Sequence, residues 1–156
     1  LKNVQRIPKN NIVPFEKMKL IRFSSENRAN DRLAEYAIDG KPSTVWHSQF
    51  SKEKKKHPHE LVIDLGQTRT INGFYYLARQ DKGWNGTFGK TEFYVSDNAD
   101  HFPEEPYVRC MFKKEKQAQR VKGDKISCRY VLVRNISEVA DNDFGSAADI
   151  AVVLAR

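Results

Sequence analysis

The sequence predicts an all-β domain, arranged as an antiparallel sandwich or a barrel. From about residue 18 onward, short runs rich in aromatic and β-branched residues follow one another. Clusters of Gly, Pro, Asn, Asp and Ser separate these runs at regular intervals. No long segment repeats its apolar residues with the 3.6-residue period of a helix. The chain should therefore consist of short strands joined by turns.

The first third of the chain is expected to contain more loop than strand. Residues 1–16 carry two prolines and mixed polarity, so we expect an extended lead-in there. The run 17–25 predicts a first strand, and 31–39 a short helical turn.

Strand signals dominate after residue 58. In 59–66 the residues alternate in polarity, which places Leu61, Ile63 and Leu65 on one face of a strand. Further strands are expected over 71–79, 90–97, 106–112, 127–135 and 149–156. Turns are expected at "DGKPS" (39–43), "LGQTRT" (65–70), "DKGWNGTFGK" (81–90), "DNADHFPEE" (97–105) and "KGDK" (122–125).

Length and composition are those of one globular domain. The 156 residues are 39% hydrophobic and 30% charged, and no apolar run approaches the roughly 18 residues of a membrane helix. We find no internal repeat and no interior linker, so 1–156 is expected to be a single module, with a β-sandwich over 17–156. The first residue is Leu and not Met, and we expect a piece of a longer protein.

The chain is basic, with a formal net charge of +7. Such a charge favours anionic partners, but a dispersed lysine excess also keeps a domain in solution. Because the lysines do not gather strongly at one site, we expect most of them on solvated loops. We further expect a monomer without a nucleic-acid partner, and we favour a membrane partner less. Cys110 and Cys128 fall on neighbouring strand-like runs, which leaves one disulfide and two free thiols both open.

The usual catalytic signatures are missing from the sequence. It contains no GxSxG, no HExxH, no CxxC and no phosphate-binding glycine loop. His57 and His59 would point the same way on a strand, which is an alternative suggestion of a small metal hydrolase. Such a site needs a third ligand, for example Asp64 or His101. We expect a binding module and not an enzyme.

The stretch "AIDGKPSTVWHSQF" (37–50) contains the elements of a cation site. Asp39 offers a carboxylate, the following turn can aim the carbonyl of Lys41 inward, and Thr44 adds a hydroxyl. Asp149 could supply a second carboxylate from a distant segment. Alone, this pattern is more typical of an ordinary Asp-Gly turn than of a cation site.

A second set of residues has the chemistry of sugar recognition. Sugar sites combine aromatic faces with a few hydrogen-bonding groups in fixed positions. His47, Arg79 and Asn85 lie at strand ends or in loops, where such groups converge. Phe50, Trp84 and Phe144 are aromatic residues in loop-like settings.

These stretches occur in an order that resembles a known superfamily. The blocks "DGKPSTVWH", "HPHELVIDLG", "RQD", "RYVLVRNISEV" and "SAADIAVV" are similar to those of the coagulation factor V/VIII type C (discoidin-like) superfamily. The similarity is closest to carbohydrate-binding module family 32, and it covers roughly residues 18–156. It implies an eight-stranded antiparallel jelly-roll β-sandwich. It also implies a non-catalytic, secreted, periplasmic or surface-exposed accessory module of a larger bacterial glycan-active enzyme.

The resemblance implies two sites. A structural calcium would be bound by the side chains of Asp39, Thr44 and Asp149 and by the carbonyls of Tyr36, Lys41 and Ala148; many relatives have glutamate where Asp149 stands. Galactose, N-acetylgalactosamine or a related sugar would be bound by His47, Arg79 and Asn85, with Phe50 and Phe144 stacking on it.

Two points stay open within that implication. Some relatives use a glutamate in the loop before the calcium turn, where this chain has Asn30 and Asp31, so the sugar is not defined. A discoidin-like module that binds a protein or an anionic membrane surface remains the alternative function.

Overall fold

The computed structural model describes residues 3–156. Within these residues, three short 3₁₀ helices and eight strands follow one another. They are η1 (Phe15–Lys17), β1 (Lys19–Phe23), η2 (Arg28–Asn30), η3 (Ala34–Ile38), β2 (Trp46–His47), β3 (His59–Leu77), β4 (Lys90–Ser96), β5 (Val108–Met111), β6 (Gln119–Asn135), β7 (Ser146–Ala147) and β8 (Asp149–Leu154). The helical turn expected within 31–39 is confirmed as η3.

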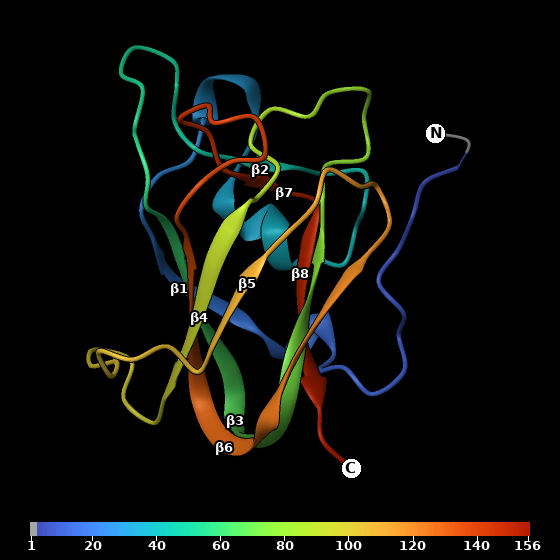
Figure 1. The fold of residues 1–156 in the computed structure, drawn as a ribbon, viewed down its shortest axis with the longest axis vertical. Helices are drawn as coiled ribbons and strands as arrows, with labels where there is room; N and C mark the ends of the chain where they lie inside the picture. Colours follow the sequence, from blue (N-terminus) through green and yellow to red (C-terminus); the bar gives the residue numbers. More distant parts are fainter. Residues whose placement is uncertain (1–2) are drawn as a thin grey trace.

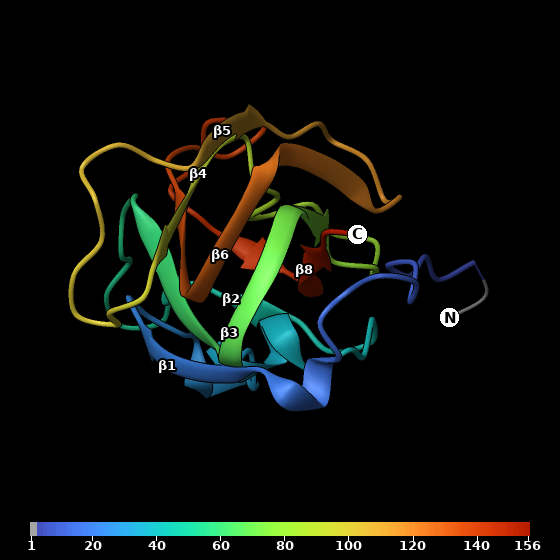
Figure 2. The ribbon, with the colours of Figure 1, turned by 90° about the horizontal axis from the view of Figure 1, so that it is seen from below.

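The strands form an antiparallel β-sandwich (Figure 1). The first half of β3 lies between β1 and the second half of β6, which continues to β4 and β5. The second half of β3 lies between β8 and the first half of β6. Seen from below, β3 and β6 are therefore shared by both layers (Figure 2). The predicted all-β, eight-stranded fold is confirmed, although β2 and β7 are only two residues long.

Two of the expected turns are wrong. The segments 65–70 and 122–125 lie inside β3 and β6, which run on as single long strands. Cross-strand pairs such as Thr70 with Ser127 continue the ladder, and its register shifts between Asp64 and Arg69 and again before Gly73. A Cβ at Gly73 would lie 2.1 Å from the Val121 carbonyl oxygen. These irregularities bend the two strands into the second layer instead of ending them.

Aromatic pairs fill the space between the layers. The rings of Phe74 and Phe93 stack at 4.1 Å, and those of Tyr76 and Phe88 at 4.4 Å. Leu61, Ile63 and Leu65 are fully buried, as their alternation predicts. Cys110 and Cys128 are free thiols, and burial raises the pKa of each to about 12.

The described part of the lead-in packs against the last strand. Val13 N–H donates to Val152 O at 2.9 Å, and Leu154 N–H donates to Asn11 O at 2.7 Å. Ile7 and Ile12 are buried in a second apolar cluster under β8. None of the helices within residues 3–156 is long and apolar enough to cross a membrane.

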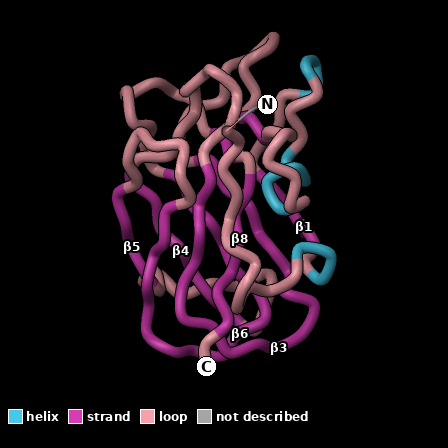
Figure 3. Tube along the Cα trace, turned by 90° about the vertical axis from the view of Figure 1, so that its right-hand side faces the viewer, coloured by secondary structure: helices cyan, strands magenta, loops and turns pink. Residues whose placement is uncertain are grey.

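Long loops gather at one end of the sandwich, around the β2–β7 pair (Figure 3). They comprise residues 48–58, 78–89 and 136–145. The C-terminus lies at the opposite end (Figures 1 and 3). This loop-bearing end, called here the apical end, contains most of the residues singled out from the sequence.

Candidate functional site

His47 lies at the centre of the apical end and is almost fully buried. It belongs to β2, which pairs with β7 through His47 and Ser146. Its Nδ1 donates to the Ser48 carbonyl at 2.7 Å. Burial is the main cause of a lowered His47 pKa, with the positive charges of Arg79 and Arg32 adding to it. The imidazole is therefore neutral at pH 7, and its Nε2 is a hydrogen-bond acceptor.

Two phenyl rings surround this imidazole. Phe50 lies 4.9 Å from the His47 ring and Phe144 lies 5.2 Å from it, between ring centroids. The two phenyl rings are 6.0 Å apart and inclined at 68°. Phe50 is 40% exposed, whereas Phe144 is half-buried. The cluster leaves apolar ring surface beside a polar acceptor.

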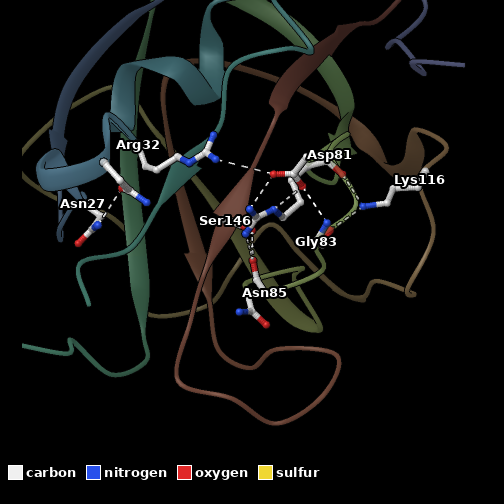
Figure 4. A network of polar contacts seen from close by, with 9 residues as sticks. Asn27, Arg32, Asp81, Gly83, Asn85, Lys116 and Ser146 are labelled. Carbon is white, nitrogen blue, oxygen red and sulfur yellow. Dashed lines mark hydrogen bonds and ion pairs between the residues drawn. The ribbon is translucent and has the colours of Figure 1, made fainter. Parts of the chain in front are cut away.

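Arg79 is held in place by the loop that follows β3, which contains Asp81 and Asn85 (both labelled in Figure 4). Its Nε and one terminal nitrogen donate to the two oxygens of Asp81, both at 2.8 Å. The other terminal nitrogen donates to the Asn85 carbonyl at 3.0 Å. The charge of Arg79 holds the pKa of Asp81 below its usual range. Arg79 is therefore a fixed donor and not a mobile surface cation.

The Asn85 turn is fixed by close packing against β7. Ser146 Oγ donates to the Asn85 carbonyl at 2.8 Å, and Ser146 N–H donates to the Gly86 carbonyl at 2.8 Å. Gly86 has φ of +90°, and a Cβ there would lie 2.5 Å from Ser146 Oγ. Glycine is the residue that this turn requires, because it avoids both the strain and the clash. The exposed Asn85 side chain keeps its amide available.

These residues enclose one cavity of about 170 Å³. It is lined by Asn30, Arg32, His47, Phe50, Arg79, Asn85 and Phe144. Five of the six predicted ligand residues thus come together. Drug-sized molecules occupy pockets of roughly 300–1,000 Å³, so this cavity has the size for a single small unit such as one sugar residue.

Trp84, the sixth predicted residue, does not line the cavity. The ammonium group of Lys116 lies 3.8 Å from the centroid of its ring, and that of Lys114 lies 5.2 Å from it. Lys116 also donates to the carbonyls of Arg79 and Gly83. The Trp84 ring therefore packs against Lys116, the lysine that supports the Arg79 loop. No spacing in the sequence indicates this contact.

Arg32 is a cavity residue that the sequence did not reveal. Its backbone lies next to β2, since His47 N–H donates to the Arg32 carbonyl at 3.3 Å. Asn30 also lines the cavity, whereas the neighbouring Asp31 accepts a hydrogen bond from Tyr36 Oη at 2.8 Å. The only sequence signal for Arg32 is its place two residues after Asn30 in an irregular loop.

The expected calcium loop lies between η3 and β2 in the chain. Thr44 Oγ1 lies 2.6 Å from Asp39 Oδ2 and 3.0 Å from the Lys41 carbonyl oxygen. Gly40 N–H donates to Asp149 Oδ1 at 3.0 Å, which connects the loop to the start of β8. Gly40 has φ of +73° and lies against Phe15.

The donor set of this loop fits a hard cation. Asp149 is 3% exposed, and burial together with the nearby Asp39 charge raises its pKa to about 8. Two adjacent carboxylates, a hydroxyl and a carbonyl are the oxygen ligands that calcium prefers. A divalent cation would offset both the cost of burying the Asp149 charge and its repulsion by Asp39.

The His57 and His59 pair does not assemble a metal centre. Their rings lie 4.4 Å apart, so they do share one side of the chain. However, His57 Nε2 bonds the Asn135 side chain and His59 Nε2 donates to the Asp143 carbonyl at 2.6 Å. Asp64 is paired with Arg129 at 3.0 Å. Within residues 3–156, no group of three His, Cys, Asp or Glu side chains could hold a metal ion.

The sequence model of the F5/8 type C domain family matches residues 21–150. The chain belongs to the F5/8 type C family. Among curated relatives of this F5/8 type C domain, a sialidase of Micromonospora viridifaciens is 31% identical over 130 residues. A galactose oxidase of Gibberella zeae is 30% identical over 117 residues. These matches cover 83% and 74% of the chain but only 20% and 17% of the relatives.

Solved structures similar to the F5/8 type C domain include carbohydrate-binding modules. A CBM32 module of Clostridium perfringens in complex with GalNAc-β-1,3-galactose has a TM-score of 0.82 and 28% identity. That match covers 91% of this chain and 99% of the module. The family 32 module of Clostridium perfringens NanJ, in complex with galactose, has a TM-score of 0.78. At 24% identity over 91% of this chain and 97% of that one, it shows the fold alone.

Proposed function

We propose that this F5/8 type C domain is a non-catalytic carbohydrate-binding module for galactose-type or N-acetylhexosamine sugars. The observation that carries the proposal is the apical cavity, in which two phenyl rings meet an imidazole, a guanidinium group and an amide. One sugar-binding relative of known structure, at 28% identity, supports the same class of ligand.

Each side chain has a distinct part in recognition. His47 Nε2 accepts a hydrogen bond from a sugar hydroxyl, because Nδ1 carries the ring proton and donates it to Ser48. A guanidinium has five N–H donors, and Arg79 spends three on Asp81 and Asn85, which leaves two for sugar oxygens. The Asn85 amide adds a further bond. Phe50 or Phe144 packs against the C–H face of the ring.

Calcium, when bound, would supply a fixed positive charge in the loop between η3 and β2. The side chains of Asp39, Thr44 and Asp149 and the Lys41 carbonyl would hold it, with the carbonyls of Tyr36 and Ala148 proposed as further ligands. Its role is structural: it would fix the loop that leads into β2 and so the position of His47.

The expected affinity for one sugar is weak. A monosaccharide has about a dozen heavy atoms, and about 0.3–0.4 kcal/mol per atom gives about −4 to −5 kcal/mol. The dissociation constant is then on the order of 0.1–1 mM. Such a module gains useful affinity when it is tethered to other binding or catalytic units. We propose that its partner is the remainder of a secreted or surface glycan-active enzyme, since the curated relatives are about five times longer than the match.

The alternative, binding to an anionic membrane through apolar loop tips, has less support from the structure. It would use Phe50, Trp84 and Phe144, but Phe144 packs on His47 and Trp84 lies beneath Lys116. Only Phe50 of the three is largely exposed.

The proposal is tested by titrating the protein with galactose, N-acetylgalactosamine and N-acetylglucosamine, alongside a glycan array. We expect His47→Ala and Arg79→Ala to weaken binding at least about tenfold, the effect of losing one good hydrogen bond to a fixed group. His101→Ala, which removes an exposed histidine outside the cavity, is the matched control. Binding to anionic vesicles with no glycan bound would contradict the sugar assignment.

A further inference from the structure

The cavity contains two guanidinium groups, from Arg32 and Arg79, and no carboxylate among its lining residues. The third ionisable lining residue, His47, has a pKa lowered by burial, so its imidazole is neutral and does not balance the two positive charges. A cavity for a neutral sugar has no electrostatic need for a second cation. The position and partners of Arg32 therefore bear on which sugar binds.

Arg79 is already neutralised by its own loop. Asp81 accepts two hydrogen bonds from it at 2.8 Å in a bidentate pair. Both carboxylate oxygens of Asp81 are thereby engaged with one guanidinium. Asp81 also accepts a hydrogen bond from Gly83 N–H at 3.1 Å, so its carboxylate is held by groups of its own loop.

Arg32 is not neutralised in the same way. Its terminal nitrogen lies 3.8 Å from Asp81 Oδ2, an oxygen that Arg79 already occupies (Figure 4). Among residues 3–156, no atom accepts a hydrogen bond from the Arg32 guanidinium. The side chain is 30% exposed, so it is held at the cavity and still open to solvent.

The other nearby acidic residues face elsewhere. Glu138 is 3% exposed, and its two oxygens accept from the backbone N–H groups of Gly86 at 2.7 Å and Asn142 at 3.0 Å. Asp31 accepts from Tyr36 Oη, and Asp143 is paired with Lys54 at 3.0 Å. Apart from its long ion pair with Asp81, the Arg32 guanidinium thus keeps its hydrogen-bond donors free for a ligand.

We propose that the sugar unit bound in this cavity carries an anionic substituent, a carboxylate or a sulfate ester, which pairs with Arg32. The inference rests on the proposed sugar-binding function and specifies its ligand class. The planar guanidinium matches the oxygens of either group in a fork-like geometry that a hydroxyl cannot offer. His47, Arg79 and Asn85 then read the ring hydroxyls, and Arg32 distinguishes acidic from neutral sugars.

The test is a set of titrations with methyl β-galactoside, methyl galactosiduronate and galactose 6-sulfate, at low and at high salt. We expect at least one acidic sugar to bind about tenfold more tightly than the neutral one at low salt, with a smaller gap at high salt. The carboxylate and sulfate arms distinguish the two sources of charge. Arg32→Gln should remove the preference for the acidic sugar.

Lys122→Gln is the matched control, because it removes the same charge from an exposed position on β6 that does not line the cavity. It should keep the acidic preference. Neutral binding without any acidic preference overturns the inference but leaves the sugar-binding function standing. Absence of binding to every sugar overturns both, and a preference that survives Arg32→Gln overturns the role of Arg32.

Discussion

Burial determines the protonation state of His59. His59 is 1% exposed, and its Nε2 donates to the Asp143 carbonyl at 2.6 Å. Its Nδ1 is buried without a partner among the described residues, so the ring cannot accept a second proton and then hydrogen-bond it. Burial lowers the His59 pKa to about 4. A neutral ring is therefore part of the folded state.

Stability should consequently fall in mild acid. Between pH 6.5 and about 4 the unfolded chain binds a proton at His59 that the folded chain does not, so the free energy of unfolding decreases as pH is lowered. The loss between pH 7 and 5 is about 2 kcal/mol. Urea unfolding at several pH values measures it. His59→Gln should flatten the pH dependence and His101→Gln should not; parallel curves for His59→Gln and the wild type would refute the assignment.

At the scale of elements, one irregular segment connects the two candidate sites. Residues 39–44 form the loop that we propose binds calcium, and β2 follows with His47. The hydrogen bond from Gly40 N–H to Asp149 ties this loop to β8, and β7, just before Asp149, pairs with β2. We therefore expect a shift of the loop 39–44 or of Asp149 to move His47, which lines the cavity.

Calcium should stabilise the protein and support sugar binding. A ligand present at a hundred times its dissociation constant adds about 2.7 kcal/mol, which raises the melting temperature of a domain of this size by about 5–10 °C. Removal of calcium with EDTA, followed by calorimetry, measures this shift. Asp149→Asn should abolish the shift, and Asp100→Asn, on an exposed turn, should retain it. An EDTA-treated protein with an unchanged melting temperature rules out the calcium site.

The elements also show where reasoning from the sequence succeeds. Alternation places Leu61, Ile63 and Leu65 in the core because a strand that is buried on one face must alternate. It fails at 65–70 and 122–125, because turn-forming residues also make bulges within a continuous ladder. A turn that ends a strand and a bulge within a strand have the same local composition. Only the strand that pairs with the segment distinguishes the two.

The site shows the same limit. His47, Arg79 and Asn85 were predicted because their motifs keep a fixed order along the chain. Arg32 reaches the cavity from a loop that lies beside β2. Trp84 packs instead against Lys114 and Lys116, which are distant from it in the sequence. Contacts of this kind depend on tertiary packing, which leaves no periodic signal in a single sequence.

At the scale of the whole molecule, the N-terminal lead-in is part of the sandwich. It pairs with β8 through Ile12 and Val153 and buries Ile7 and Ile12 against Leu77 and Ala151. An extended segment with two prolines thus completes the outer edge of the second layer.

Loss of one of these side chains should be costly. We expect Ile12→Ala to lower the free energy of unfolding by about 2–5 kcal/mol, the range for a buried large-to-small change. Ile21→Ala, at a position that is 41% exposed on β1, is the matched control and should cost far less. Chemical denaturation of both variants compares them. Equal losses would mean that the lead-in packs only loosely on β8.

The sharing of β3 and β6 by both layers has a consequence for how the protein opens. Neither layer can separate without breaking the same ladder, which runs from His59 with Asn135 to Tyr76 with Gln119. Slowly exchanging backbone amides of both layers should therefore exchange with solvent deuterium together, in one cooperative event. The apical loops lie outside that ladder, so their amides should exchange much faster. The apical end can therefore open locally while the sandwich stays folded.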